Sequence, residues 1–296
     1  MRSIGLTATS LLALLAACSG GGVSTPIPPP DEIAPRIEAV REAVRKNEAA
    51  LKAPIEDHLD ALENTIASIM QKHGDHSVEA VQVLQETSVL LAEKKRPDLA
   101  LPFMERALTL SREVYGLDHR ETAYPLHDVA VLLAMIAPDQ YDPRAELLYR
   151  GAAEVRRHQA GVDDPETAAS EAQLAWQLLL SATRESLPYR KYPLLAEAEQ
   201  LALHAQRVFD AHKDRSSWYQ IRRTLIETAF AHGDFAAVQE RAGELLADRD
   251  YEKGPGLYPD ATAKDLLAEA IELQAALLPE VEPPKARALQ ESSHEH

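Results

Sequence analysis

Two segments of the chain carry the same eight-residue pattern, Gly116-Leu117-Asp118-His119-Arg120-Glu121-Thr122-Ala123 and Gly161-Val162-Asp163-Asp164-Pro165-Glu166-Thr167-Ala168. A related segment, His73-Gly74-Asp75-His76, precedes them, so that successive glycines are 42 and 45 residues apart. Glycine readily ends a helix in a left-handed conformation, and aspartate caps the start of the next helix. A pattern repeated at this period predicts a stack of helical hairpins.

The segments between these turns have the pattern expected of paired helices. Ala100 to Val114 and Ala145 to Arg157 each carry small or apolar residues at helical spacing, and their starts are 45 residues apart. The three residues by which the second period is longer fall in the connection from Met135 to Pro143, where a loop absorbs an insertion at little cost.

Over about 73–180 the chain resembles tetratricopeptide repeats of the kinesin-light-chain type. The family motif reads Gly-x-Asp-His-Pro-x-Thr-Ala, followed by Leu-Asn-Asn-Leu-Ala. The resemblance implies an all-α solenoid of helical hairpins in a right-handed superhelix. It also implies a peptide-binding groove where the Asn pair faces the ligand. The matching positions are Gln85-Glu86, with a register uncertain by one residue, His127-Asp128 and Ala172-Gln173. None is Asn, which weakens the expectation of backbone clamping.

The flanks extend this repeat domain to 36–278. Helices are expected at Leu194 to His212, Ser216 to His232 and Ala236 to Ala247, with an insertion at Glu185 to Pro193. Ile33 to Leu51 and Pro54 to Lys72 are expected to form an N-terminal cap, and Asp260 to Leu278 a C-terminal capping helix. An unrelated helical bundle is the alternative for these flanks.

The first residues form an export signal, with Arg2, an apolar run from Ile4 to Leu15, and Leu15-Ala16-Ala17 before Cys18. This resembles the signal of bacterial lipoproteins, which implies removal of 1–17, lipid on Cys18 and, with Ser19 next, an outer-membrane location facing the periplasm. An ordinary secretory signal with a chance cysteine is the alternative. Residues 18–35 are predicted to be a flexible Gly/Pro tether, and 279–296 a disordered tail.

Composition excludes several classes of protein. The net charge of −16 disfavours nucleic acid and gives no basic face for anionic lipid. Cys18 is the only cysteine, which excludes disulfides within the chain and thiolate metal clusters. We find no catalytic or phosphate-binding motif, and we predict no cofactor, metal site or enzymatic activity. His73, His76 and His119 lie in the repeat turns, where the resemblance already expects histidine.

One further segment is a candidate contact surface. Trp218, Tyr219, Arg222 and Arg223 place aromatic and basic residues together in an acidic protein. Trp218 could equally belong to the core, and Trp176 is expected to. The sequence therefore predicts a membrane-anchored, non-enzymatic scaffold that binds an envelope protein or peptide. The alternatives are a binder of a small ligand or glycan in the superhelix cavity and, less favoured, an enzyme with residues from separate repeats.

Overall fold

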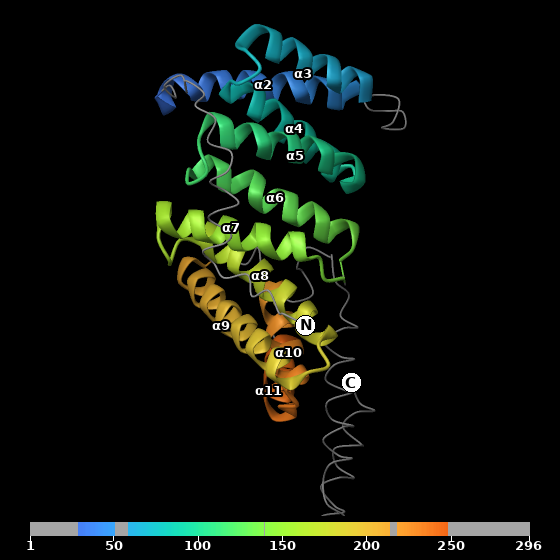
Figure 1. Ribbon diagram of the computed structural model, residues 1–296, viewed down its shortest axis with the longest axis vertical. Coiled ribbons are helices and arrows are strands. Elements are labelled where there is room, and N and C mark those ends of the chain that lie inside the picture. The colour runs from blue at the N-terminus through green and yellow to red at the C-terminus, as the bar shows by residue number, and fades with distance from the viewer. Residues whose placement is uncertain (1–28, 51–58, 139, 214–217, 248–296) are drawn as a thin grey trace, which may run out of the picture.

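The computed structural model describes residues 29–50, 59–138, 140–213 and 218–247, and every regular element in these ranges is an α-helix. The helices follow one another down a single elongated stack (Figure 1). Their bounds are α2 Pro30–Ala50, α3 Leu59–His73, α4 Val78–Glu93, α5 Pro97–Val114, α6 Arg120–Ile136, α7 Pro143–Ala160, α8 Pro165–Arg184, α9 Pro188–His212, α10 Trp218–His232 and α11 Phe235–Ala247.

The helices form hairpins that stack in chain order. Helix α4 pairs with α5, α6 with α7, α8 with α9 and α10 with α11, and each hairpin packs on the next through α5–α6, α7–α8 and α9–α10. We call the first helix of each pair helix A and the second helix B. The predicted all-α solenoid of tetratricopeptide-like hairpins is confirmed.

The turns between hairpins explain the repeated sequence pattern. Gly116 and Gly161 have φ angles of 94° and 106°, a region that side chains with a Cβ rarely adopt. Three residues later an N-cap, His119 or Asp164, accepts a backbone hydrogen bond from the following helix. The repeated threonine stabilises the turn through a hydrogen bond to the glycine carbonyl. Thr122 Oγ1 donates to Gly116 O at 2.7 Å, and Thr167 Oγ1 donates to Gly161 O at 3.0 Å.

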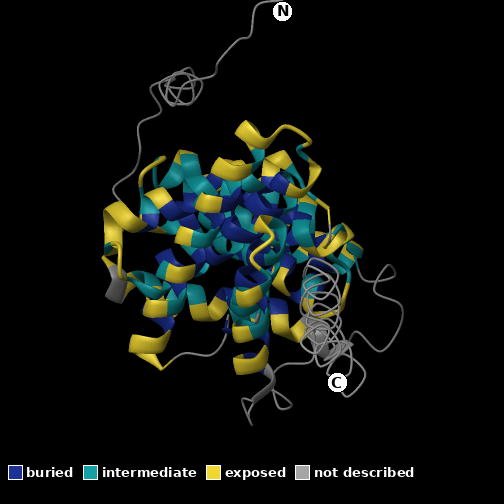
Figure 2. Ribbon diagram, turned by 90° about the horizontal axis from the view of Figure 1, so that it is seen from below, coloured by how far each residue is buried: buried dark blue, intermediate teal, exposed yellow. Residues whose placement is uncertain are grey.

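The largest apolar core extends from α2 to α10, and two smaller clusters lie around Trp176 and Trp218, all buried between the helices (Figure 2). Small residues allow the helices to approach closely, because an alanine side chain adds little width at a helix contact. The B helices share two such positions, which are fully buried in each of three repeats: Ala100 and Ala107, Ala145 and Ala152, and Ala198 and Ala205.

Several helix boundaries differ from the sequence predictions. Helix α2 begins at Pro30, inside the stretch expected to be tether, because proline fits the first turn of a helix as well as an extended chain. Helix α9 begins at Pro188, so most of the expected insertion is helical. The signal sequence, Cys18, the capping helix 260–278 and the tail 279–296 lie outside the described residues. Among the described helices, none combines the length and hydropathy needed to span a bilayer.

Candidate functional site

The predicted groove positions occupy the same place on three successive A helices. The N-caps of α4, α6 and α8 are Ser77, His119 and Asp164. Counting from each cap, the eighth and ninth residues are Gln85-Glu86, His127-Asp128 and Ala172-Gln173. The residues on both sides of each pair are buried, whereas all members of the pairs except Ala172 are partly exposed. Counting from the caps therefore aligns Gln85-Glu86 of α4 with His127-Asp128 and Ala172-Gln173 without the one-residue uncertainty left by the sequence.

His127 belongs to a polar network that joins two hairpins. Its Nδ1 lies 3.1 Å from Ser170 Oγ on α8, and its ring meets that of Tyr149 edge-on. Ser170 also accepts a hydrogen bond of 2.7 Å from Arg156 Nη1 on α7, and the same nitrogen donates to Glu166 O at 2.9 Å. Arg156 is only 5% exposed. The buried guanidinium of Arg156 thus joins α7 to α8 through hydrogen bonds, and His127 connects α6 to the same Ser170 hydroxyl.

Burial changes the ionisation of the predicted pair on α6. Burial and, to a smaller extent, the charge of Arg156 together lower the pKa of His127 to about 3. Burial also raises the pKa of Asp128 to about 6, and Arg156 partly opposes this shift. Near neutral pH His127 is therefore neutral, and the carboxylate of Asp128 is the charged group of this pair on α6.

The corresponding residues of α4 and α8 have different surroundings. Glu86 accepts hydrogen bonds from Arg41 Nε on α2 at 2.8 Å and from Gln82 Nε2 at 2.6 Å. Gln173 is partly exposed and Ala172 is buried. Across α6 and α8, Tyr124 donates to Glu166 Oε1 at 2.7 Å, and Arg120 contacts the same oxygen at 3.2 Å. The predicted groove positions thus present mostly carboxylate and amide groups, and Glu86 is already hydrogen-bonded.

The aromatic and basic residues of α10 make mainly internal contacts. Trp218 is 9% exposed and Arg222 lies over its ring at 4.5 Å. Arg223 lies over the ring of Trp176 at 4.4 Å and donates to Glu227 at 2.6 Å. Trp176 is a core residue, as predicted. Tyr219 lies in α10, and its side chain is outside the described part. A role in partner binding stays a prediction for Tyr219, Arg222 and Arg223.

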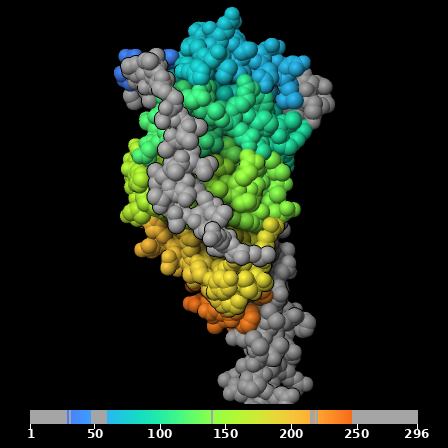
Figure 3. Space-filling model, viewed as in Figure 1, coloured from blue at the N-terminus to red at the C-terminus, as the bar shows by residue number. Residues whose placement is uncertain are grey.

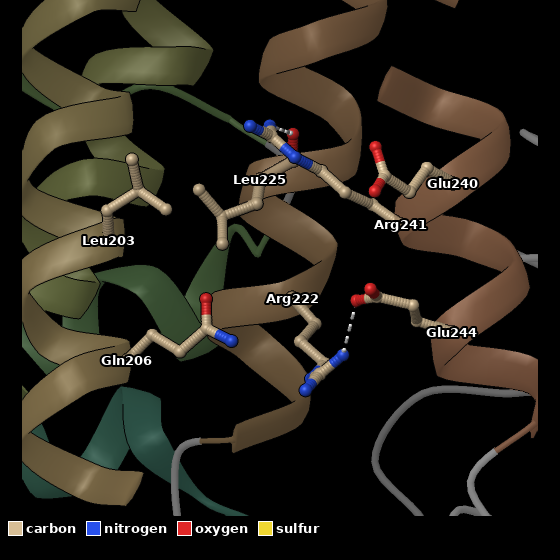
Figure 4. A pocket seen from close by; sticks show the side chains of 7 residues that line it. All are labelled: Leu203, Gln206, Arg222, Leu225, Glu240, Arg241 and Glu244. Atoms are coloured by element: carbon tan, nitrogen blue, oxygen red, sulfur yellow. Dashed lines mark hydrogen bonds and ion pairs between the residues drawn. The ribbon is translucent and has the colours of Figure 1, made fainter. Parts of the chain in front are cut away.

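Two hollows lie away from the predicted groove pairs. One of about 200 Å³ lies between α9, α10 and α11, where Arg222 points towards Glu244 at 3.4 Å (Figure 4). Another of about 460 Å³ lies on α3, α4 and α5, beside Met70, Leu84 and Pro102. Neither includes any of the residues at the eighth and ninth positions of α4, α6 and α8.

The histidines of the repeat turns have structural partners. His119 Nδ1 accepts the N–H of Glu121 at 3.2 Å, and its ring stacks on Tyr115. His73 lies 3.0 Å from the buried Glu79, and His76 lies 2.9 Å from Glu113. Within the described ranges, no group of three or more His, Cys, Asp or Glu residues is arranged to hold a metal ion.

Sequence reasoning missed Arg156 and Ser170. In the sequence, Arg156 belongs to a basic run at the end of a helix, which normally predicts solvent exposure. Its burial depends on the neighbouring hairpin, which supplies Ser170 and the Glu166 carbonyl. The one available signal was positional, since Arg156 lies four residues after the buried Ala152, where the preceding helix B has Ser111 four residues after Ala107.

Comparison with known proteins supports the fold and goes no further. No family model and no curated protein matches the sequence. A crystal structure from Podosopora anserina, of a protein described as a kinesin light chain with nearly identical TPR-like repeats, is similar with a TM-score of 0.54. Its sequence is 13% identical, over 74% of this chain and 96% of that one. BtubC (BKLC) from P. vanneervenii is 18% identical, covering 76% and 92% of the two chains with a TM-score of 0.48. The fold is therefore that of tetratricopeptide-like repeats.

Proposed function

We propose that this protein is a lipid-anchored, non-enzymatic scaffold of the bacterial cell envelope whose A-helix groove binds another envelope protein or peptide. The observation that carries the proposal is the recurrence of polar, partly exposed residues at one position of successive A helices. Glu86, Asp128 and Gln173 are each the ninth residue after a helix cap. Such a regular row suits an extended partner, which presents its own groups at regular intervals.

The chemistry of this row indicates what the partner offers. Asp128 is charged near neutral pH and accepts hydrogen bonds, Gln173 can donate and accept, and Glu86 keeps a carboxylate next to Arg41. Backbone N–H groups or a basic side chain of a partner would complement them. This differs from clamping by paired asparagines, because only the amide of Gln173 both donates and accepts.

Lipid on Cys18 would hold the scaffold at the membrane. The support is the sequence Leu15-Ala16-Ala17-Cys18 at the end of an apolar segment. Several acyl chains together give stable anchoring, since each buried methylene contributes roughly 0.8 kcal/mol. The residues between Cys18 and Pro30 would then separate the helical stack from the lipid. We place the protein at the outer membrane, facing the periplasm.

A pair of matched variants tests the groove. Gln173→Arg puts a long cation in the groove, whereas Gln200→Arg makes the same change at an exposed position of α9. Proteins that copurify from detergent-solubilised envelopes after crosslinking would be quantified for each variant. We expect Gln173→Arg to lose a specific partner that Gln200→Arg retains. Equal recovery by both variants, or no specific partner with the wild type, would refute the groove proposal.

The anchor is tested separately. Cys18→Ser should leave the protein soluble or unprocessed while the circular dichroism of its helices is unchanged. The measurement is the distribution between membrane and soluble fractions, with Ser19→Ala as the control. A correctly cleaved Cys18→Ser protein that stays in the membrane fraction would show that the lipid is not its anchor.

A further inference from the structure

Helix α9 is longer than the other B helices at its N-terminal end. It has 25 residues, whereas α5 and α7 have 18 each. Its extra residues come from the segment Glu185 to Pro193, which has no counterpart in the preceding hairpins. In Figure 3 the yellow and orange surface of the last described helices forms the lower end of the stack.

The extension of α9 is packed against its neighbours near Tyr192 and Leu195 and exposed near Tyr189. Leu195 is fully buried in a small cluster with Trp176 and Leu179, and the Tyr192 ring stacks on His232 of α10 at 5.8 Å. Tyr189, by contrast, is 70% exposed, the highest value among the large apolar and aromatic residues described as exposed. The exposed aromatic ring therefore sits on a helix that is held in place from below.

Three cations lie near Tyr189 in the chain, and none has an acidic partner within the described ranges. They are Arg184, Arg190 and Lys191, of which Arg190 lies over the Tyr189 ring at 5.7 Å. Several other arginines of α7–α11 contact carboxylates, such as Arg150 with Glu197 and Arg241 with Glu199. In a protein with a net charge of −16, residues 184–191 carry three cations and one acid, Glu185, so this segment has a net positive charge.

The helix end adds to this positive potential. Helix α9 has no acidic residue in its first turn and no side-chain cap on Leu187, whereas α8 begins with the Asp164 cap and Glu166. Arg190 and Lys191 follow at the positive end of the helix dipole, where cations are unfavourable and anions are stabilising. The local helix chemistry is thus unfavourable unless an anion approaches.

We propose that the α9 tip, formed by Arg184, Leu187, Tyr189, Arg190 and Lys191, is a second docking surface that binds an acidic segment of a partner protein. Arginine and tyrosine are enriched among the residues that contribute most to protein–protein interfaces, and the planar guanidinium of arginine can form two parallel hydrogen bonds to a carboxylate. Leu187, 43% exposed, gives an apolar neighbour for one aliphatic or aromatic side chain of that segment. An anionic bilayer fits less well, because its extended surface would also face the rest of the acidic protein, whereas a short acidic segment contacts only the tip.

This surface is distinct from the A-helix groove. The tip lies at the turn between α8 and α9, and it contains none of the residues at the eighth and ninth positions of the A helices. A partner could therefore engage the groove and the tip with separate segments, so either contact can be lost without the other.

The test uses a panel of fluorescent peptides in which glutamates flank one Phe or Leu, and matched peptides with Gln in place of Glu. Binding to the full chain would be measured by fluorescence anisotropy. We expect at least one Glu peptide to bind, and Arg190→Glu/Lys191→Glu to weaken it about tenfold, because two attractions become repulsions. Tyr189→Ala should weaken it as well. Arg207→Glu/Lys213→Glu is the control, since it reverses two exposed cations elsewhere on the same helix and its end.

The other outcomes count against the proposal. No binding by any Glu peptide, equal binding of the Gln peptides, or equal loss in the control variant would overturn it. Binding to phosphatidylglycerol vesicles that the tip variant abolishes, without peptide binding, would assign the tip to lipid instead. A concentration-dependent dimer lost in the tip variant, again without peptide binding, would assign it to a second copy. Because Gln173→Arg should leave peptide binding unchanged, failure here is distinguishable from failure of the groove proposal.

Discussion

Two successive joints of the same stack, α5–α6 and α7–α8, are built with different chemistry. The residue four positions after the buried alanine is Ser111 in α5 and Arg156 in α7. Ser111 satisfies its hydroxyl within its own helix, on Leu108 O at 3.1 Å. Arg156 instead reaches the next hairpin and binds Ser170 and the Glu166 carbonyl. The same repeat geometry therefore accepts a short local contact in one joint and a buried cation in the next.

The difference shows which features the repeat requires. In α9 the equivalent position, four residues after Ala205, is the buried Phe209. Serine, arginine and phenylalanine all fit because the alanines set the distance between helices, and each joint fills the remaining space in its own way. Shared alanines therefore specify the stack, and the variable position adapts each joint.

Removing the buried cation should have the largest effect. Arg156→Ala leaves a cavity and takes hydrogen bonds from Ser170 and Glu166 O, so we expect a loss of about 3 kcal/mol in the free energy of unfolding. Ser111→Ala, the matched change in α5, should cost about 1 kcal/mol or less. Urea denaturation followed by circular dichroism measures both.

An apolar replacement should sharpen the same comparison. Arg156 Nε has no hydrogen-bond partner among the described residues, so the network does not fully satisfy the guanidinium. Arg156→Met combined with Ser170→Ala should therefore recover part of the stability that Arg156→Ala loses. Equal losses for Arg156→Ala and Ser111→Ala would remove the distinction between the joints.

The turn threonines should show what the two joints have in common. Thr122→Val and Thr167→Val each remove a buried hydroxyl that donates to the glycine carbonyl of the preceding turn, and Thr122 adds only a long contact of 3.4 Å to Ser111 O. We expect similar losses of about 1–2 kcal/mol from the two variants, because each leaves a carbonyl with one hydrogen bond fewer. Thr109→Val, on the exposed side of α5, is the control. Markedly unequal losses would mean that the turns are not equivalent.

The smallest effect concerns the dependence of stability on pH. His127 binds a proton below about 3 when folded and below 6.5 when unfolded, so its contribution to stability falls as pH drops through this window. Asp128 has the opposite effect, because its folded pKa of about 6 exceeds its ordinary value of 3.8 and its contribution falls as pH rises between them. In the wild type the two contributions oppose each other between pH 3.8 and 6.

Asp128→Asn removes one of these opposing contributions. Its unfolding free energy should rise more steeply from about pH 4 to 6 than that of the wild type, and should exceed it at about pH 7 by on the order of 1 kcal/mol. Urea denaturation at several pH values measures this, with the exposed Asp210→Asn as the control. Parallel curves for Asp128→Asn and the wild type would contradict the assignment of these pKa shifts.

The sequence by itself determined the hairpin stack, the turns and the predicted groove positions. These depend on local chemistry that repeats along the chain: glycine at a positive φ, a capping side chain, a threonine at a fixed offset and alanines at the contacts. A single segment contains all of that information. The period of 42 and 45 residues then predicts which segments become neighbours.

Only the tertiary structure decided which polar residues are buried and which exposed residues gather. Arg156 and Arg190 both belong to basic, helical segments, yet one is enclosed by the next hairpin and the other lies at an exposed helix end. The physical reason is that burial and charge pairing depend on residues far away in the chain, such as the carboxylates that meet Arg150 and Arg241 from 47 and 42 positions away. A local sequence pattern cannot predict which distant residues become those partners.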